Sequence, residues 1–191
     1  MNPNGRRKFI AGSALAPSAL LVGASDVAGA NSNKGLMGRV SVFDFFPPEA
    51  IDDAFSGEPT LDHTEYLQRA IDLCPQYGVL EAFGGVLRVT NTLRVPAKYI
   101  TINFCSLIRV GKKFVGDYVL EVQKYKVKPY FSAPVFIENL RLDCSGIARG
   151  LRAYYVDHCS LRNVRVENAW GCAISLERVR ESVVEFPVVM N

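Results

Sequence analysis

Four charged residues in the last third of the chain recur at a spacing that could serve acid–base chemistry. Asp143 and Glu167 fall at equivalent positions of two similar stretches, and Arg141 and Arg165 each stand two positions before one of them. On neighbouring strands the two carboxylates would lie about 4.8 Å apart, where they could share a proton, act on a glycosidic bond or bind Ca²⁺. We therefore predict Asp143, Glu167, Arg141 and Arg165 as catalytic residues. The alternative is a solvated ladder of arginine and acid side chains that keeps a β-surface soluble.

The two stretches that carry these residues, 136–143 and 160–167, align along their whole length. Asn139 aligns with Asn163, and an arginine and an acid align after them. A third copy, residues 182–189, follows at a similar interval and has Glu185 in the asparagine position. Repeats of this length indicate stacked supersecondary units, each of which buries its apolar face against its neighbours.

Apolar and polar residues alternate within each unit, as they do in β-strands. The sequence therefore predicts an all-β solenoid, a parallel β-helix with one coil per about 22–24 residues. About four coils fill residues 85–191, and the last is incomplete. Asn139 and Asn163 would face inward at a bend, one above the other, with hydrogen bonds between their side-chain amides. The strands are expected at 85–89, 92–95, 99–104, 106–110, 118–122, 135–142, 150–156, 159–166, 171–176 and 182–189.

The segment before the coils, residues 40–84, indicates a short strand at 40–45 and a helix at 63–74. Asp62 stands at the N-cap of this helix, Glu65 completes a capping box three residues later, and Pro75 ends the helix. Its apolar stripe would cover the open first coil. We predict helix 63–74 as the N-terminal cap of the β-helix, and residues 31–39 as a flexible lead-in.

Residues 1–30 have the features of an export signal. Arg6 and Arg7 head a weakly apolar stretch that ends in a small-x-small pattern at 28–30. This pattern is typical of a twin-arginine signal, with an ordinary secretory signal as the alternative, and its apolar run is too short for a stable membrane anchor. We expect an exported protein, periplasmic or extracellular. Removal of residues 1–30 takes away three basic residues and one acidic residue and so lowers the net charge from +3 to +1, which argues against nucleic acid as a partner.

The five cysteines form no CxxC pair, and the only two histidines are far apart in the sequence, so we expect no zinc site. Substrates of the twin-arginine route fold in a reducing compartment before export. We therefore expect buried free thiols and no obligatory disulfide.

Residues 61–72, with residues 42–45 before them and residues 84–89 after them, resemble the opening of the pectate-lyase-like right-handed β-helix superfamily. Phage tailspike depolymerases and secreted polysaccharide lyases and hydrolases begin in a similar way. The resemblance covers about residues 40–191. It implies a right-handed parallel β-helix, a polysaccharide partner and lyase or hydrolase chemistry, and it allows a homotrimer. Residues 155–160 are similar to the Trp-Ile-Asp-His-Cys-Ser stretch of pectate lyases, which implies substrate binding by Asp157 and His158, beside the structural role that such turns also have.

Aromatic and basic residues could also contact a sugar. Trp170, Tyr154 and Tyr155 could form a stacking platform for hexose rings, unless one of them packs inward. Lys126 lies among lysines and tyrosines on the insertion 123–134 and could meet an anionic glycan. Alternating lysines on a strand are most often its solvent face.

The chain ends in mid-coil on the apolar residues 186–191, so we expect the N-terminal portion of a longer protein. The leading hypothesis is an exported, carbohydrate-active protein that binds and cleaves an acidic or capsular polysaccharide. The alternatives are a non-catalytic glycan-binding, adhesion or tailspike-like structural module and an inactive gene fragment. No cofactor is expected apart from Ca²⁺.

Overall fold

The computed structural model describes residues 38–123 and 133–190. The predicted export signal, most of the lead-in and Lys126 therefore lie outside the described residues. Within the described ranges the chain is mostly β-strand, with helices confined to the N-terminal part. The helices are the 3₁₀-helix η1 (Val42–Phe45), α1 (Pro48–Phe55) and α2 (Thr64–Leu73). The strands are β1 (Arg39–Ser41), β2 (Gly78–Ala82), β3 (Val86–Pro96), β4 (Ile100–Phe104), β5 (Leu107–Gln123), β6 (Val135–Glu138), β7 (Arg141–Asp143), β8 (Arg149–Tyr154), β9 (Cys159–Arg162), β10 (Arg165–Glu167), β11 (Ile174–Glu177), β12 (Val183–Glu185) and β13 (Val188–Met190).

The strands form two parallel sheets, as the sequence predicts. The six-stranded sheet, here called wall 1, has the order β1-β2-β4-β6-β9-β12. The seven-stranded sheet has two limbs that share the long strands β3 and β5. Residues 86–89 of β3 and 107–110 of β5 continue into β7, β10 and β13, which together form wall 2. Residues 93–96 of β3 and 120–123 of β5 continue into β8 and β11, which together form wall 3.

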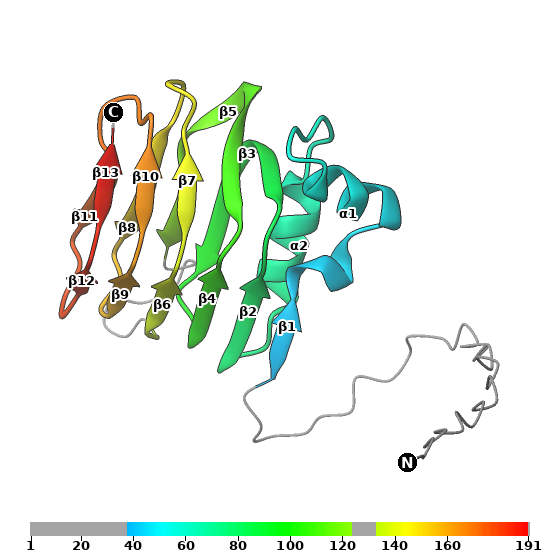
Figure 1. Cartoon of the computed structure of the whole chain (residues 1–191). Coiled ribbons are helices and arrows are strands. Elements are labelled where there is room, and N and C mark those ends of the chain that lie inside the picture. Colours follow the sequence, from blue (N-terminus) through cyan, green and yellow to red (C-terminus); the bar gives the residue numbers. More distant parts are fainter. Residues whose placement is uncertain (1–37, 124–132, 191) are drawn as a thin grey trace, which may run out of the picture. The chain divides into compact units, whose positions relative to one another are not determined.

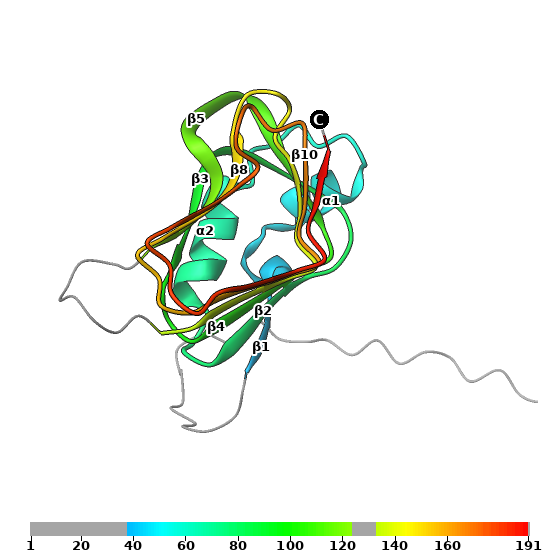
Figure 2. The same ribbon diagram turned by 90° about the vertical axis from the view of Figure 1, so that its left-hand side faces the viewer.

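The three walls enclose the core. Figure 1 shows the strands stacked side by side, and Figure 2 looks along the stack and shows the backbone running round all three walls. Because strand residues point alternately to the two faces of a sheet, each wall sends rows of side chains inward. One inward row of each wall is fully buried over four strands, Leu80, Ile102, Ile137 and Leu161 in wall 1 and Leu87, Ile108, Leu142 and Val166 in wall 2. Val184 and Val189 continue these rows into β12 and β13, where they are exposed.

Stacked asparagines mark the corner between walls 1 and 2. Asn163 donates a side-chain hydrogen bond to Asn139 (2.8 Å), and Asn139 donates one to Asn103 (2.9 Å). The predicted amide stacking is therefore confirmed and gains a third member. The side chains are not deeply buried as expected, since Asn139 is half-buried and Asn163 is exposed. Both residues have positive φ, 55° and 52°, a conformation that asparagine tolerates better than most residues.

The predicted register of the third repeat is wrong by one residue. Glu185 pairs with Arg162, so Phe186, with φ 52°, occupies the corner position that Asn163 holds in the preceding turn. The sequence does not define the register of the third copy, because two adjacent valines, 183 and 184, interrupt the alternation of apolar and polar residues found in the earlier copies. The stack of amides consequently ends at Asn163.

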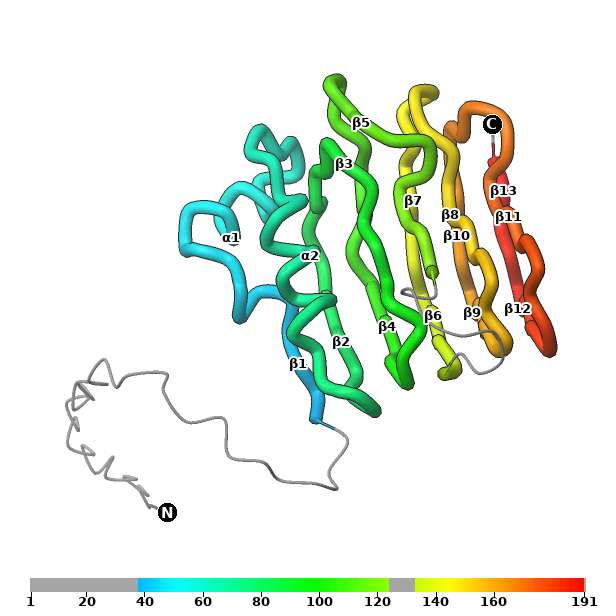
Figure 3. The backbone as a smooth tube through the Cα atoms, turned by 180° about the vertical axis from the view of Figure 1, so that it is seen from behind, coloured from blue at the N-terminus to red at the C-terminus, as the bar shows by residue number. Residues whose placement is uncertain are grey.

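Helix α2 covers the free edge of β3, which is the first strand of wall 3 within the described residues. The backbone groups along this edge need partners other than a strand. The Gln68 side chain supplies two of them, because it donates to the carbonyl of Arg94 (2.9 Å) and accepts the N–H of Arg94 (2.8 Å). Thr64 Oγ1 accepts the N–H of Thr90 (2.9 Å). The helix expected at 63–74 is confirmed as Thr64–Leu73, and Figure 3 shows it lying alongside β3 at the N-terminal end of the stack.

The start of this region differs from the prediction in detail. The N-cap of α2 is His63, whose side chain makes no capping bond, so the capping box expected from Asp62 and Glu65 is wrong. Asp62 instead accepts hydrogen bonds from the backbone N–H (3.0 Å) and the hydroxyl (2.6 Å) of Thr64. The strand expected at 40–45 ends at Ser41, which caps η1 by accepting the N–H of Phe43 (3.2 Å).

Two elements were not predicted, and several predicted strands merge. Helix α1 begins with a proline at its first position, which a helix tolerates because that N–H needs no partner. Strand β2 pairs with β1 and β4 in wall 1. The strands expected at 85–89 and 92–95 form the single strand β3, and those expected at 106–110 and 118–122 form β5. They merge because β3 and β5 pair across the corner, with register shifts on either side of Asn91.

Candidate functional site

Arginine and aromatic side chains alternate on the outer face of wall 3, and we call this group the aromatic–arginine face. The Arg149 guanidinium lies over the rings of Tyr118 (5.5 Å to the centroid) and Trp170 (5.6 Å). The Arg152 guanidinium lies over Tyr118 (5.5 Å) and Tyr154 (4.6 Å). At these distances the ring quadrupole attracts a cation. The five side chains thus form one connected series from Trp170 to Tyr154.

The strand register of wall 3 builds this series. Tyr118 of β5 pairs with Arg149 of β8, and Gln123 of β5 pairs with Tyr154. Alternation alone would place Arg149 and Arg152 on opposite faces, because they are an odd number of positions apart. Gly150 and Leu151 between them are both buried, however, so the two arginines emerge on the same side.

Two glutamates hold Arg152 in place. Its guanidinium donates to Glu177 of β11 (2.8 Å) and lies 3.8 Å from Glu121 of β5. The hydrogen bond with Glu177 raises the pKa of Arg152, and the same bond lowers the pKa of Glu177. Both groups therefore stay charged across the physiological range. Arg149 has no such carboxylate within ion-pair distance among the described residues, and its hydrogen bond with Tyr118 raises its pKa.

The three predicted platform residues all lie outside the core. The rings of Tyr154 and Tyr155 meet edge to face, with centroids 4.3 Å apart, and Arg178 lies 4.7 Å from the Tyr155 ring centroid. Trp170 is 60% exposed and joins the two tyrosines only through the arginines of the aromatic–arginine face. The alternative that one of the three packs inward is therefore wrong. Sequence reasoning missed Tyr118, Arg149 and Arg152, which only the strand register brings to these aromatics.

The predicted catalytic residues lie on wall 2, away from this series in the sheet. Arg141 pairs with Arg165 and Asp143 with Glu167, as the repeat spacing predicts. Asp143 accepts hydrogen bonds from Arg109 Nε (3.2 Å), Asn168 Nδ2 (2.9 Å) and the Ser145 N–H (3.0 Å). The hydrogen-bond donors to this carboxylate thus come from the protein itself.

Glu167 is paired in the same manner. It accepts a hydrogen bond from Arg165 Nε, and Arg141 lies 3.9 Å from the same oxygen. Wall 2 thus carries alternating arginine and acid side chains on its outer face. These contacts favour the solvated ladder over an acid–base pair, and the catalytic assignment of the four residues remains a prediction.

Asp157 and His158 lie in the turn between β8 and β9. His158 Nε2 is 2.6 Å from Glu181 Oε2, and both side chains are largely exposed. Asp157 is half-buried. The structure therefore gives His158 a surface contact, and the binding role of the two residues stays a prediction, as does that of Lys126.

A buried histidine that the sequence did not flag ties the N-terminal helices to β3. His63 Nδ1 accepts the N–H of Arg88 (3.1 Å), which leaves the proton on Nε2, and Nε2 lies 3.3 Å from Asp53 Oδ2. Burial lowers the pKa of His63, although the carboxylates of Asp53 and Asp62 act in the opposite direction. Because the ring is fully buried, it fastens α1 to wall 2 and does not meet a ligand.

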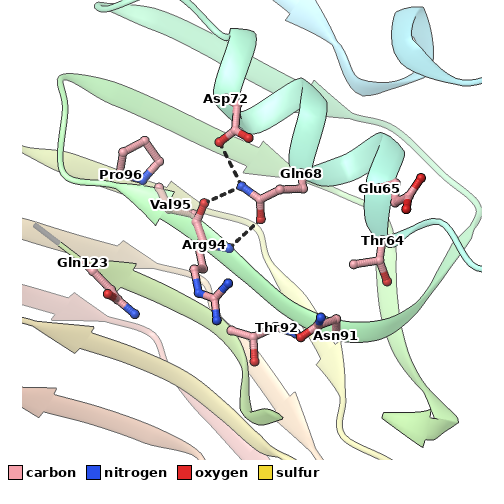
Figure 4. A pocket seen from close by; sticks show the side chains of 10 residues that line it. All are labelled: Thr64, Glu65, Gln68, Asp72, Asn91, Thr92, Arg94, Val95, Pro96 and Gln123. Atoms are coloured by element: carbon pink, nitrogen blue, oxygen red, sulfur yellow. Dashed lines mark hydrogen bonds between the residues drawn. The ribbon is translucent and has the colours of Figure 1, made fainter. Parts of the chain in front are cut away.

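A cleft of about 380 Å³ opens between α2 and the start of wall 3 (Figure 4). Its helix side includes Glu65, Gln68 and Asp72, and its strand side includes Arg94 of β3 and Gln123 of β5. Gln123 pairs with Tyr154 in the next turn, so the strand side of the cleft continues into the aromatic–arginine face.

The described residues hold no group of three His, Cys, Asp or Glu side chains that could bind a metal ion. All five cysteines are free; Cys74, Cys144 and Cys159 are buried, whereas Cys105 and Cys172 are exposed. Within residues 38–123 and 133–190, no helix is long and apolar enough to cross a membrane. No protein-family model, no curated protein and no solved structure matches this chain.

Proposed function

We propose that the aromatic–arginine face of wall 3 binds a polysaccharide. The observation that carries this proposal is the connected series Trp170, Arg149, Tyr118, Arg152 and Tyr154. Tyr118 is buried beneath the two arginines and holds them in place, whereas Trp170 and Tyr154 offer rings that a sugar can reach. Sugar rings stack on aromatic faces, and their hydroxyl groups pair with charged side chains. Two strand spacings separate β5, which carries Tyr118, from β11, which Trp170 precedes, so the face extends about 10 Å along the stack. A short stretch of a polysaccharide chain can contact it.

The charges of this face favour an acidic polysaccharide. Glu121 and Glu177 flank Arg152, whereas Arg149 and Arg178 form no ion pair within the described residues and keep their charge available. Arginine presents a planar donor array that suits carboxylate and sulfate groups. The proposed ligand is therefore an anionic glycan bound by stacking and by arginine contacts together.

Binding is supported better than cleavage. A carboxylate pair for hydrolysis, or a base for β-elimination, must be free to meet the substrate. Asp143 and Glu167 are instead engaged by arginines on wall 2. Lyase or hydrolase activity, with Asp143, Glu167 and their two neighbouring arginines as its candidates, is tested in the binding experiment below.

We further propose that the stacked parallel walls are part of a right-handed parallel β-helix of the pectate-lyase-like type. The parallel pairing, the enclosed core and the asparagine stack support this assignment. Export to the periplasm or the exterior is proposed from residues 1–30 alone. Assembly as a homotrimer stays a prediction.

Affinity electrophoresis tests the proposed function. Gels are cast with polygalacturonate, alginate, hyaluronan or chondroitin sulfate, and with neutral dextran as the control polymer. We expect at least one anionic polymer to retard the protein, and Trp170→Ala to weaken that retardation by about two- to thirteenfold, since one stacked ring contributes about 0.5–1.5 kcal/mol. Phe83→Ala is the matched control, because Phe83 is similarly exposed (54%) but follows β2 in wall 1.

The same samples are incubated with each polymer and examined for unsaturated products and new reducing ends. Either product would add cleavage to the proposal and would call for the Asp143→Ala and Glu167→Ala variants. If no anionic polymer retards the wild-type protein, or if Trp170→Ala migrates like the wild type, the proposed binding face is wrong.

A further inference from the structure

The cleft between α2 and wall 3 has opposite charges on its two sides. Glu65 and Asp72 lie on the helix side, and Arg94 lies on the strand side (Figure 4). No Arg94 nitrogen is within ion-pair distance, 4.0 Å, of a carboxylate oxygen of the described residues, and its guanidinium makes no hydrogen bond there. Glu65 likewise has no cationic partner in that part of the chain. The cleft thus separates a cation from two anions that do not neutralise one another.

The helix presents its polar side chains to the cleft as one stripe. Glu65, Gln68 and Asp72 follow the i, i+3, i+7 spacing, which places them on one face of α2. Glu65 stands in the first turn, where the helix dipole stabilises a negative charge. Asp72 stands next to the last residue of the helix, where the dipole opposes a negative charge. Lys98 compensates the dipole at this end, since its ammonium group donates to the carbonyls of Ile71 (3.2 Å), Asp72 (3.3 Å) and Cys74 (2.6 Å), and the Asp72 carboxylate remains without an ion pair in the described residues.

Gln68 fixes the geometry of both sides. Its amide nitrogen donates to Asp72 Oδ1 (2.9 Å) and to the carbonyl of Arg94 (2.9 Å), while its oxygen accepts the Arg94 N–H (2.8 Å). All contacts to Arg94 use backbone atoms, so the guanidinium remains available. Gln68 therefore orients the carboxylate of Asp72 and holds the strand that carries Arg94 in place. Because these groups are already ordered, a ligand loses little affinity to the entropy cost of ordering them.

We infer that this cleft binds a small zwitterion with the charge pattern of an α-amino acid. The ligand carboxylate pairs with Arg94, its ammonium group pairs with Asp72, and its carbon skeleton packs on Pro96 of β3. The volume of about 380 Å³ falls within the usual range of small-molecule sites. This site is independent of polymer binding on the aromatic–arginine face. The zwitterion can be a free amino acid or an amino sugar acid of a glycan.

Isothermal titration calorimetry of the protein with L-serine, L-valine and L-glutamine tests the inference. Each amino acid is compared with its N-acetyl derivative, which lacks the ammonium group, and with its methyl ester, which lacks the carboxylate. We expect at least one amino acid to bind and both derivatives to bind at least tenfold more weakly. Muramic acid is the amino sugar acid in the panel. If it binds tighter than every amino acid, the source is a glycan, and the reverse order indicates a free metabolite; both orders support the zwitterion site.

Two variants locate the site without disturbing the fold. Arg94→Gln removes the cation and retains the backbone bonds to Gln68, and Asp72→Asn removes the anion and retains the acceptor oxygen for Gln68. Each should weaken binding at least tenfold, whereas the exposed Lys113→Gln control on β5 should bind as the wild type does. Trp170→Ala should also leave this binding unchanged, which separates it from the proposed function. The inference fails if no zwitterion binds at millimolar concentration, if the blocked derivatives bind equally well, or if Arg94→Gln binds normally.

Discussion

Replacement of Asn139 by alanine should destabilise the protein by about 3 kcal/mol. Its side chain makes two hydrogen bonds in the asparagine stack, 2.8 and 2.9 Å long. A typical intramolecular hydrogen bond contributes about 1 kcal/mol net, so their loss accounts for about 2 kcal/mol. Asn139 also has φ 55°, and alanine in this left-handed region costs roughly 1 kcal/mol more than asparagine.

Three matched variants separate these two contributions. Asn139→Gly loses both hydrogen bonds but tolerates positive φ, so we expect it to be about 1 kcal/mol more stable than Asn139→Ala. Asn139→Asp keeps only the acceptor and should lie between the wild type and the glycine variant. Asn163→Ala loses one bond of the stack at a similar φ of 52° and should cost about 2 kcal/mol.

Urea unfolding followed by far-ultraviolet circular dichroism and by the fluorescence of the single tryptophan measures these differences. Agreement between the two signals would justify a two-state analysis. If Asn139→Ala changes the free energy of unfolding by less than about 0.5 kcal/mol, the asparagine stack does not stabilise the corner and the reasoning from its hydrogen bonds is wrong.

Three further predictions concern packing, pH and thiols. Gly150→Ala would place its new carbon 2.6 Å from a side-chain carbon of β10, so it should cost more than about 2 kcal/mol; a melting temperature equal to the wild type would contradict this. Burial lowers the pKa of His63 below its ordinary 6.5, so the unfolded chain binds the proton first and stability should be lost as the pH falls below that value. Urea titrations at about pH 8 and about pH 5 measure this loss, and a flat profile would refute it. Burial raises the pKa of Cys144 and Cys159 to about 12, so iodoacetamide should modify only the two exposed thiols of the native protein but all five in urea, as counted by mass spectrometry.

The parallel strands were predictable because identical residue types recur at a constant interval. Arg141 and Arg165 pair directly, because they are separated by the same interval as the stacked Asn139 and Asn163. The N-terminal turns could not be predicted as well, because the pairing that precedes Asp143 and Glu167 in their own row, Arg109 with Asp143, spans a longer interval. A search for a constant period does not find this pairing, because its interval differs from that of the later turns. Arg109 was missed as a partner of Asp143 for this reason.

The candidate sites could also be predicted only in part, because their side chains are brought together by pairing between distant strands. Trp170, Tyr154 and Tyr155 could be selected as aromatic residues near polar sequence, and all three are outside the core. Arg149 could not be selected, because its position beside Tyr118 depends on pairing between distant strands and on the break in alternation at Gly150. The cleft beside Arg94 depends on how Gln68 binds the edge of β3, which no pattern of hydropathy encodes.

The parallel register has a consequence for the order in which the chain folds. Arg165 of β10 pairs with Arg141 of β7 on one side and with Val188 of β13 on the other, so β10 and β13 close loops of nearly the same length, whereas β7 closes a longer one. The entropy lost in such closure depends only weakly on loop length, and it is therefore nearly constant from one turn to the next. Folding can then proceed by stepwise growth on the template that α2 and β3 provide, and its rate is set by the first turns and not by the total length of the stack.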